Sequence, residues 1–259
     1  MILETLLTGT AQLLWPARCA GCDDYVPDHL TFCPACAVSV TPLWGTCAGC
    51  ALPRGPETLA AAPAGPRCRA CRRAPFAFAQ AEVACEYGAA LADAIVRMKH
   101  GARRDLARRL ARLRVDPLLR LLAGGDLGPR DAVVPVPLHP RKLRRRGFNQ
   151  ALELAQGALA ILARRRNGPA GGVHGLPVLE RRALRRIRDT RELGHLGPAA
   201  RLAEVAGAFA VRGEGRLRGR RVVLIDDVFT TGATLNECAS VLRSAGASEV
   251  RVVALARAV

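Results

Sequence analysis

The chain has 259 residues and is poor in aromatic residues and in long apolar runs. Aromatic residues make up 4% of it, too few for an extended platform on which nucleic-acid bases stack. No apolar stretch reaches the roughly twenty residues that cross a bilayer, so we expect no membrane insertion. Residues 1–18 include Glu4 and lack a positive leading segment, which argues against a signal peptide. We therefore expect a cytoplasmic protein.

Lysine is also scarce, although the chain is strongly basic. Of its 39 basic residues only Lys99 and Lys142 are lysines, and the formal net charge is +17. A GC-rich genome would explain so much arginine and alanine. The excess nevertheless raises the affinity for any polyanion, nucleic acid or diphosphate, in a salt-dependent way. Binding to a nucleic-acid backbone is compatible with this composition, whereas sequence reading is not indicated.

Cysteine is abundant at the amino end. Eight of the ten cysteines form pairs with two intervening residues. The pairs are Cys19 with Cys22, Cys33 with Cys36, Cys47 with Cys50, and Cys68 with Cys71. Each pair can point two thiolates at one metal, and two pairs complete a tetrahedral sulfur site, which suits zinc. We expect two structural Zn²⁺ ions, and we expect chelation to unfold this end.

The spacing alone does not decide which pairs share a metal. Joining the first two pairs and the last two closes the shorter loops, at less entropic cost, but an interleaved assignment stays open. Disulfides are disfavoured without a secretory signal, and an iron–sulfur cluster is a weaker alternative to zinc. Cys85 and Cys238 stand outside the pairs, and we expect both to be buried free thiols.

The segment Val222–Thr234, VVLIDDVFTTGAT, is the most informative part of the chain. Its aliphatic run predicts a strand buried on both faces of a parallel sheet, and Ala233–Ala245 has helical spacing. Backbone N–H groups of Thr230–Thr234 at the helix start can hold a phosphate. The adjacent Asp226 and Asp227 can accept hydrogen bonds from vicinal hydroxyls. The segment therefore predicts a site for ribose 5-phosphate.

This segment resembles the motif that binds PRPP, 5-phosphoribosyl 1-diphosphate, in type I phosphoribosyltransferases. Together with Pro135–Ala155 and the four cysteine pairs, it resembles the ComF family. The resemblance implies an α/β type I phosphoribosyltransferase fold, a twisted, mainly parallel sheet flanked by helices, with a small N-terminal double zinc ribbon. We expect an N-terminal helix and double zinc ribbon over residues 1–75, and a phosphoribosyltransferase-like domain over residues 80–259.

Periodicity places the main elements of the second domain. Strands are expected at Glu82–Tyr87 and Ala132–Leu138, and helices at Ala89–Lys99, Arg103–Leu122 and Phe148–Arg165. His139–Gly147, HPRKLRRRG, is expected to be a cationic loop.

The resemblance implies the roles of individual residues. Asp226 and Asp227 would be the catalytic pair that orients the ribose, directly or through water on Mg²⁺. Thr230, Thr231, Gly232, Ala233 and Thr234 would fix the 5′-phosphate, and Arg141, Lys142, Arg146 and Lys99 would complete the PRPP site. A compact ammonium suits diphosphate oxygens, although any one arginine of the run could simply be a solvated surface residue. Mg²⁺ would bridge the diphosphate and the ribose hydroxyls.

The chain departs from the family pattern at two positions, where Leu193 replaces a glutamine and Glu204 an asparagine. These changes put turnover in more doubt than PRPP binding. His139 and His195 lie near the same loops, and we expect both to be surface residues rather than bases.

Two functions remain open. The first is a PRPP-binding protein of DNA uptake and natural transformation that handles single-stranded DNA and has a competence helicase as a partner. The second is an active phosphoribosyltransferase that transfers phosphoribose from PRPP to a nitrogen nucleophile. A purely structural zinc protein would leave the carboxyl-terminal motif unexplained. The acceptor and the oligomeric state do not follow from the sequence.

Overall fold

The computed structural model describes residues 17–53, 67–101, 103–123, 128–166, 175–190, 197–213 and 215–258. The expectations for residues 1–16 and for Leu193 and His195 lie outside these ranges. The helices are α2 (Pro34–Ala37), α3 (Arg69–Arg73), α4 (Ala89–His100), α5 (Arg104–Ala123), α6 (Pro140–Arg146), α7 (Gln150–Arg166), α8 (Pro198–Val205) and α9 (Ala233–Ser244). The strands are β1 (Gln80–Glu86), β2 (Ala132–Pro135), β3 (Val178–Leu179), β4 (Leu184–Arg186), β5 (Phe209–Val211), β6 (Arg221–Phe229) and β7 (Glu249–Arg257).

Five strands form the central sheet, in the order β1-β7-β6-β2-β3, and every neighbouring pair is parallel. The two long strands β6 and β7 occupy its middle and are nearly continuous aliphatic runs, as expected of strands covered on both faces. A separate antiparallel pair, β4 and β5, lies outside this sheet. The expected mainly parallel α/β sheet is confirmed.

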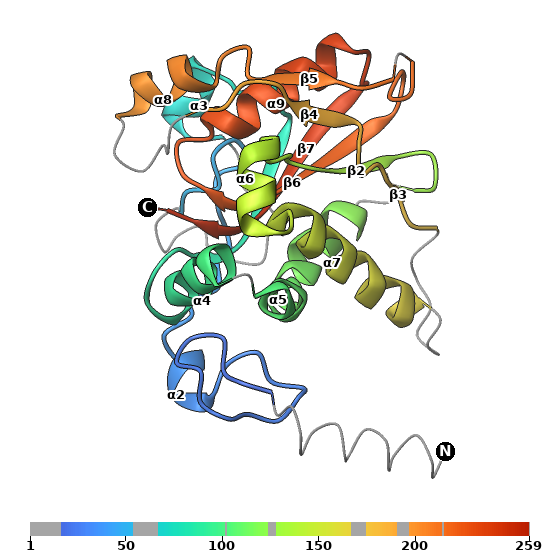
Figure 1. The fold of residues 1–259 in the computed structure, drawn as a ribbon. Helices are drawn as coiled ribbons and strands as arrows, with labels where there is room; N and C mark the ends of the chain where they lie inside the picture. Colours follow the sequence, from blue (N-terminus) through green and yellow to red (C-terminus); the bar gives the residue numbers. More distant parts are fainter. Residues whose placement is uncertain are drawn as a thin grey trace.

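Successive residues of β6 face opposite layers of the core. Val222 and Leu224 belong to the cluster that includes α9, and Val223 and Ile225 belong to the cluster that includes α7. This alternation follows from the period of two in a strand. Helix α9, with the β4–β5 pair, covers one face of the sheet, and α4, α5 and α7 cover the other (Figure 1).

Most of the segment His139–Gly147 forms helix α6 (Pro140–Arg146), and the expectation of a cationic loop is wrong. The side chain of His139 caps the start by accepting a hydrogen bond from the backbone N–H of Arg141, and Pro140 occupies the first turn. Gly147 ends the helix with φ +80°, a left-handed conformation that glycine adopts readily. Arginine and leucine between these caps are good helix formers. The capping residues, rather than the charge, therefore decide the local structure.

The cysteine-rich segments pack directly on the sheet. The backbone N–H of Leu43 donates to the carbonyl of Ala84 at 2.9 Å, and that of Glu86 donates to Thr41 at 2.8 Å. Cys19 and Cys47 are fully buried within clusters that also contain residues of the sheet. The amino end thus lacks a separate core within the described residues, and its stability depends on these contacts.

The described helices include none that combines the length and apolarity of a membrane span.

Candidate functional site: two cysteine clusters and a basic cleft

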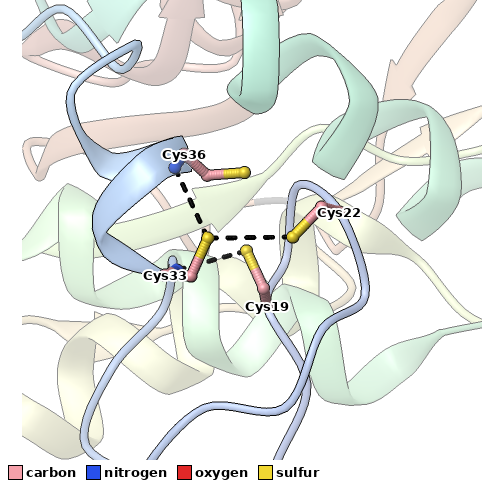
Figure 2. Close-up of side chains that lie close together, drawn as sticks. All are labelled: Cys19, Cys22, Cys33 and Cys36. Carbon is pink, nitrogen blue, oxygen red and sulfur yellow. Dashed lines mark hydrogen bonds between the residues drawn. The ribbon is translucent and has the colours of Figure 1, made fainter.

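The first four cysteines converge on one point (Figure 2). Their sulfur atoms lie within 4.8 Å of one another, with Cys22 Sγ 3.7 Å from Cys33 Sγ. Backbone N–H groups approach two of the sulfurs, from Cys33 to Cys19 Sγ at 3.2 Å and from Cys36 to Cys33 Sγ at 3.4 Å. The 3.7 Å between Cys22 Sγ and Cys33 Sγ is well beyond the roughly 2 Å of a disulfide bond, and all four cysteines are free thiols. The arrangement is that of a four-sulfur metal site.

The second four cysteines repeat the arrangement. Cys47, Cys50, Cys68 and Cys71 also have sulfurs within 4.8 Å of one another. The backbone N–H groups of Gly49 and Cys68 donate to Cys47 Sγ at 3.3 and 3.1 Å. Burial alone would raise the pKa of the Cys47 thiol, but the backbone hydrogen bonds lower it to about 6.

Both clusters fit the donor set expected of structural zinc. Four sulfurs form each group, no His, Asp or Glu joins either group among the residues that the structure describes, and N–H···S bonds favour the thiolates that bind a metal. The structure joins the first two pairs and the last two, so the assignment with the shorter loops is confirmed and the interleaved one is excluded. Cys85 and Cys238 are buried outside both clusters, as expected.

A cleft of about 460 Å³ opens at the carboxyl ends of the sheet strands. Parallel strands bring their last residues to one edge, so segments far apart in the sequence meet there. The residues predicted for the site that line the cleft are Asp226, Asp227, Thr230, Thr231, Gly232, Ala233, Thr234, Lys99, Lys142 and Arg146. Arg141 does not line it; its side chain is 76% exposed and lies 3.7 Å from Asp189.

The two aspartates sit within β6 rather than beyond its end. Lys99 Nζ, from the last turn of α4, lies 2.8 Å from Asp227 Oδ2. Burial acts to raise the pKa of Asp227, but the charge of Lys99 outweighs it and holds the pKa below its usual value. Burial and the neighbouring charge of Asp227 raise the pKa of Asp226 to about 7. The pKa values of the two adjacent carboxyl groups are therefore shifted in opposite directions.

The segment Thr230–Thr234 links β6 to α9. Gly232 caps the helix with φ +82°, and no side chain provides the cap. The first amides of a helix lack intrahelical acceptors and lie at its positive end. An added Cβ at Gly232 would lie 2.7 Å from Phe229 Cε2 and 2.9 Å from Phe76 Cε1, so both the conformation and the space require glycine. The geometry suits a bound anion.

Helix α6 brings cations to the opposite rim. Lys142 Nζ donates to the backbone carbonyl of Thr190 at 2.9 Å, and Arg146 donates to Gln150 Oε1 at 2.6 Å. Gln150, the first residue of α7, and Arg145 also line the cleft. An anion of several charges would meet these groups on one side and the helix start of α9 on the other.

Sequence reasoning missed three lining residues with polar or charged side chains, Tyr87, His100 and Arg186. Tyr87 and His100 each lie at the end of an element that was expected, so their position at the carboxyl edge could have identified them. Arg186 offered no such signal. Its guanidinium reaches Thr190 Oγ1 and stacks 5.2 Å from the Phe209 ring, and burial lowers its pKa.

The structure also describes His139 and Glu204, two residues that the sequence analysis singled out. His139 Nδ1 lies 3.5 Å from Asp189 Oδ1, and the histidine caps α6 without lining the cleft. Glu204 lies in α8, where its backbone carbonyl accepts a 2.8 Å hydrogen bond from Arg188.

Known proteins resemble the chain over most of its length. Residues 153–258 match the model of the phosphoribosyl transferase domain. A DNA utilization protein YhgH of Salmonella typhi is 30% identical over 229 residues, 88% of this chain and 91% of that protein. Competence protein F of Haemophilus influenzae is 35% identical over 129 residues, 49% of this chain and 51% of the relative. Competence protein ComFC of Streptococcus pneumoniae is 31% identical over 124 residues, 48% of this chain and 47% of the relative.

The matched domain contains the aspartate pair and the segment that begins α9, and the long alignment with the YhgH protein extends well beyond that domain. The chain belongs to the ComF family, and in this chain the phosphoribosyl transferase domain follows two cysteine clusters that suit zinc.

Proposed function

We propose that the chain binds PRPP with Mg²⁺ in the basic cleft and acts in DNA uptake and natural transformation by handling single-stranded DNA. One observation carries the PRPP part: the cleft combines a glycine-capped helix start, an aspartate pair and a cationic helix. The three features suit the three parts of PRPP, namely the 5′-phosphate, the ribose hydroxyls and the diphosphate.

Each group has a distinct task in this proposal. The amides of Thr230–Thr234 hold the 5′-phosphate. Asp226 and Asp227 accept hydrogen bonds from the ribose hydroxyls, directly or through water on Mg²⁺. Lys142 and Arg146 meet the diphosphate, and Lys99 holds Asp227 ionised. Arg141 reaches the diphosphate only if its exposed side chain turns away from Asp189.

The cysteine clusters hold two structural Zn²⁺ ions in this proposal. In this proposal the double zinc ribbon lies within residues 1–75, and the phosphoribosyltransferase-like domain comprises residues 80–259. The protein acts in the cytoplasm, where thiols stay reduced and PRPP is available.

The names of the relatives and the charge support the DNA part. The relatives are DNA utilization and competence proteins, and this chain carries a formal net charge of +17. Arg144 and Arg145 are exposed neighbours on α6, and Arg145 lines the cleft. Phosphate contacts at such a rim bind a single strand without reading its bases. A competence helicase is the protein partner that we propose to deliver or receive that strand.

A second function, phosphoribosyl transfer, is favoured by the pKa of about 7 at Asp226. A carboxyl group that titrates near neutral pH suits general acid–base catalysis. A nitrogen nucleophile would bond to C1 of PRPP while the C1–O bond breaks. Diphosphate would leave with the electron pair, and the nitrogen would lose a proton. Release of diphosphate in the presence of candidate bases distinguishes this enzyme from a binding protein.

Calorimetric titration with PRPP and Mg²⁺ tests the first proposal. The wild type should bind, and the double variant Asp226→Asn with Asp227→Asn should not. Asp116→Asn is the matched control, because Asp116 is an aspartate that lies 3.6 Å from Arg165 and does not line the cleft. Absence of binding by the wild type would exclude both functions.

The affinity for a labelled single-stranded oligonucleotide, measured across a range of salt concentrations, tests the DNA part. Replacing Arg144 and Arg145 with glutamine should reduce the magnitude of the slope of log affinity against log salt by about 1.4 if both contact phosphates of the single strand. Glutamine at Arg164 and Arg165, exposed on the last turn of α7, is the matched control. A wild-type slope near zero would rule out a phosphate-contacting surface.

A further inference from the structure

Arg257, the last residue of β7, connects the second cysteine cluster to the cleft. Its side chain is buried, with the residue 6% exposed. Nε donates to the carbonyl of Cys50 at 2.7 Å, and Nη1 donates to the carbonyls of Phe229 and Thr230 at 3.0 and 2.6 Å. One guanidinium therefore binds the backbone of a metal-cluster residue and the first residue of the Thr230–Thr234 segment.

The surroundings of Arg257 fix it in this position. Within the described part of the chain, its partners are backbone carbonyls and no carboxylate pairs with it. The guanidinium carbon lies 4.8 Å from the centre of the Phe229 ring, a cation–π contact. A buried cation without a carboxylate depends on well-placed acceptors, so a shift of Cys50 or Thr230 moves the other through Arg257.

Aromatic packing forms a second connection between the same two places. Phe76, which follows the last cysteine of the cluster by five residues, meets Phe229 edge-on with ring centres 6.0 Å apart. The space above Gly232 is closed by these two rings. The backbone N–H of Ala77 donates to Asn236 Oδ1, in the first turn of α9, at 2.7 Å. The segment after the cluster thus packs against the start of α9.

The first cysteine cluster has an arginine of its own, but among the described residues this arginine makes no hydrogen bond to a residue of the cleft. Arg109 of α5 donates to the carbonyls of Arg18 and Leu30, and to that of Thr31 at 3.5 Å. None of these residues lines the cleft. The two arginines perform the same anchoring task for two clusters, and only Arg257 also binds the Thr230–Thr234 segment.

We propose that the second cysteine cluster positions the Thr230–Thr234 segment through Arg257, so that zinc in this cluster and a phosphate ligand in the cleft stabilise each other's binding. Arg257 is a positioning residue, because it acts on the segment's backbone and does not line the cleft. The inference rests on the proposed zinc and PRPP sites. Coupling between two binding sites is reciprocal, so each ligand must raise the affinity for the other.

The first experiment compares PRPP affinity, with Mg²⁺, in the full-length zinc-loaded wild type, Arg257→Lys and Arg109→Lys. Lysine cannot reach the carbonyls of Cys50 and Thr230 together. We expect Arg257→Lys to raise the Kd of PRPP about tenfold and Arg109→Lys to change it less than about twofold. If Arg257→Lys does not fold, Asn236→Leu, at a partly exposed position, removes the contact with Ala77 and should also weaken PRPP binding.

The second experiment uses the wild type and needs no activity. A chromogenic chelator follows zinc release with and without saturating PRPP. A kinetic phase that Arg109→Lys accelerates is assigned to the first cluster, and one that Arg257→Lys accelerates is assigned to the second. Asn236→Leu takes the place of Arg257→Lys if that variant does not fold. PRPP should slow release from the second cluster about tenfold and leave the first unchanged. If the wild type binds PRPP, but PRPP does not change the rate of zinc release and the variants bind PRPP as tightly as the wild type, the coupling between the two sites is overturned while the proposed function stands. If the wild type does not bind PRPP, the proposed function fails with it.

Discussion

The ammonium nitrogen of Lys99 lies 2.8 Å from Oδ2 of Asp227, across the cleft edge between α4 and β6. This ion pair raises the pKa of Lys99 despite its burial and helps to lower that of Asp227. The pair leaves Asp226 as the carboxyl group that titrates near neutral pH. One lysine thus determines which of two adjacent aspartates is charged before any ligand binds.

Replacing Lys99 with arginine should weaken PRPP binding about tenfold while the protein still folds. The charge is kept, but a planar guanidinium is larger than an ammonium and cannot occupy the same position beside Asp227. Arg97→Lys on the same helix is the control, because Arg97 points to Asp23 and does not line the cleft. Calorimetry measures both, and an unchanged affinity in Lys99→Arg would show that a compact ammonium is not required.

Replacing Asp226 with asparagine should stabilise the ligand-free protein at pH 8 while abolishing PRPP binding. Asp226 has a raised pKa, so between 3.8 and about 7 the unfolded chain loses a proton that the folded protein keeps. Stability therefore falls as pH rises through this window, and asparagine removes that loss. We expect a gain on the order of 1 kcal/mol, or roughly 2–4 °C in Tm. A variant that is less stable than the wild type at pH 8 would contradict the assigned pKa.

Binding of PRPP and Mg²⁺ should release protons near neutral pH. If the ligand needs Asp226 ionised, and its pKa is about 7, about half a proton leaves this group for each ligand bound at pH 7. Calorimetry in buffers of different ionisation enthalpy counts these protons. The count should fall towards zero at pH 8.5, where both Asp226 and the ligand phosphates are already ionised. A constant count between pH 7 and 8.5 would show that Asp226 is not the titrating group.

The sequence predicted the parts of the site that are contiguous and failed where partners come from distant segments. The run Val222–Thr234 carries its strand, its aspartates and its helix start in one stretch, so its geometry follows from local rules. The contact between Arg257 and Cys50 joins residues 207 positions apart. A lone arginine near the end of a strand gives no sign of its partner, because strand order and register set that contact.

Helix α6 shows a different kind of failure. Residues His139–Gly147 were expected to form a cationic loop. The helix forms because His139 and Gly147 cap its two ends, and its fixed axis places Lys142 and Arg146 in the cleft while Arg141 points away. A helix places neighbouring side chains on different faces. The expectation of a loop could not distinguish the residues that enter the cleft from the one that points away.

Replacing Gly232 with alanine should abolish measurable PRPP binding, while the protein still folds with reduced stability. The new Cβ would lie within 3 Å of the Phe229 and Phe76 rings, at a backbone conformation with φ +82° that alanine rarely adopts. The start of α9 must shift to relieve this contact, and the amides that face the phosphate shift with it.

Gly207→Ala separates the effect of backbone conformation from that of the steric contact, because Gly207 has φ +66° but nothing within 4 Å of its added Cβ. Both variants should lose about 1 kcal/mol of stability from the backbone conformation, measured by thermal unfolding. PRPP affinity should fall only in Gly232→Ala, and an equal loss in Gly207→Ala would attribute the effect to general destabilisation instead of the position of the helix start.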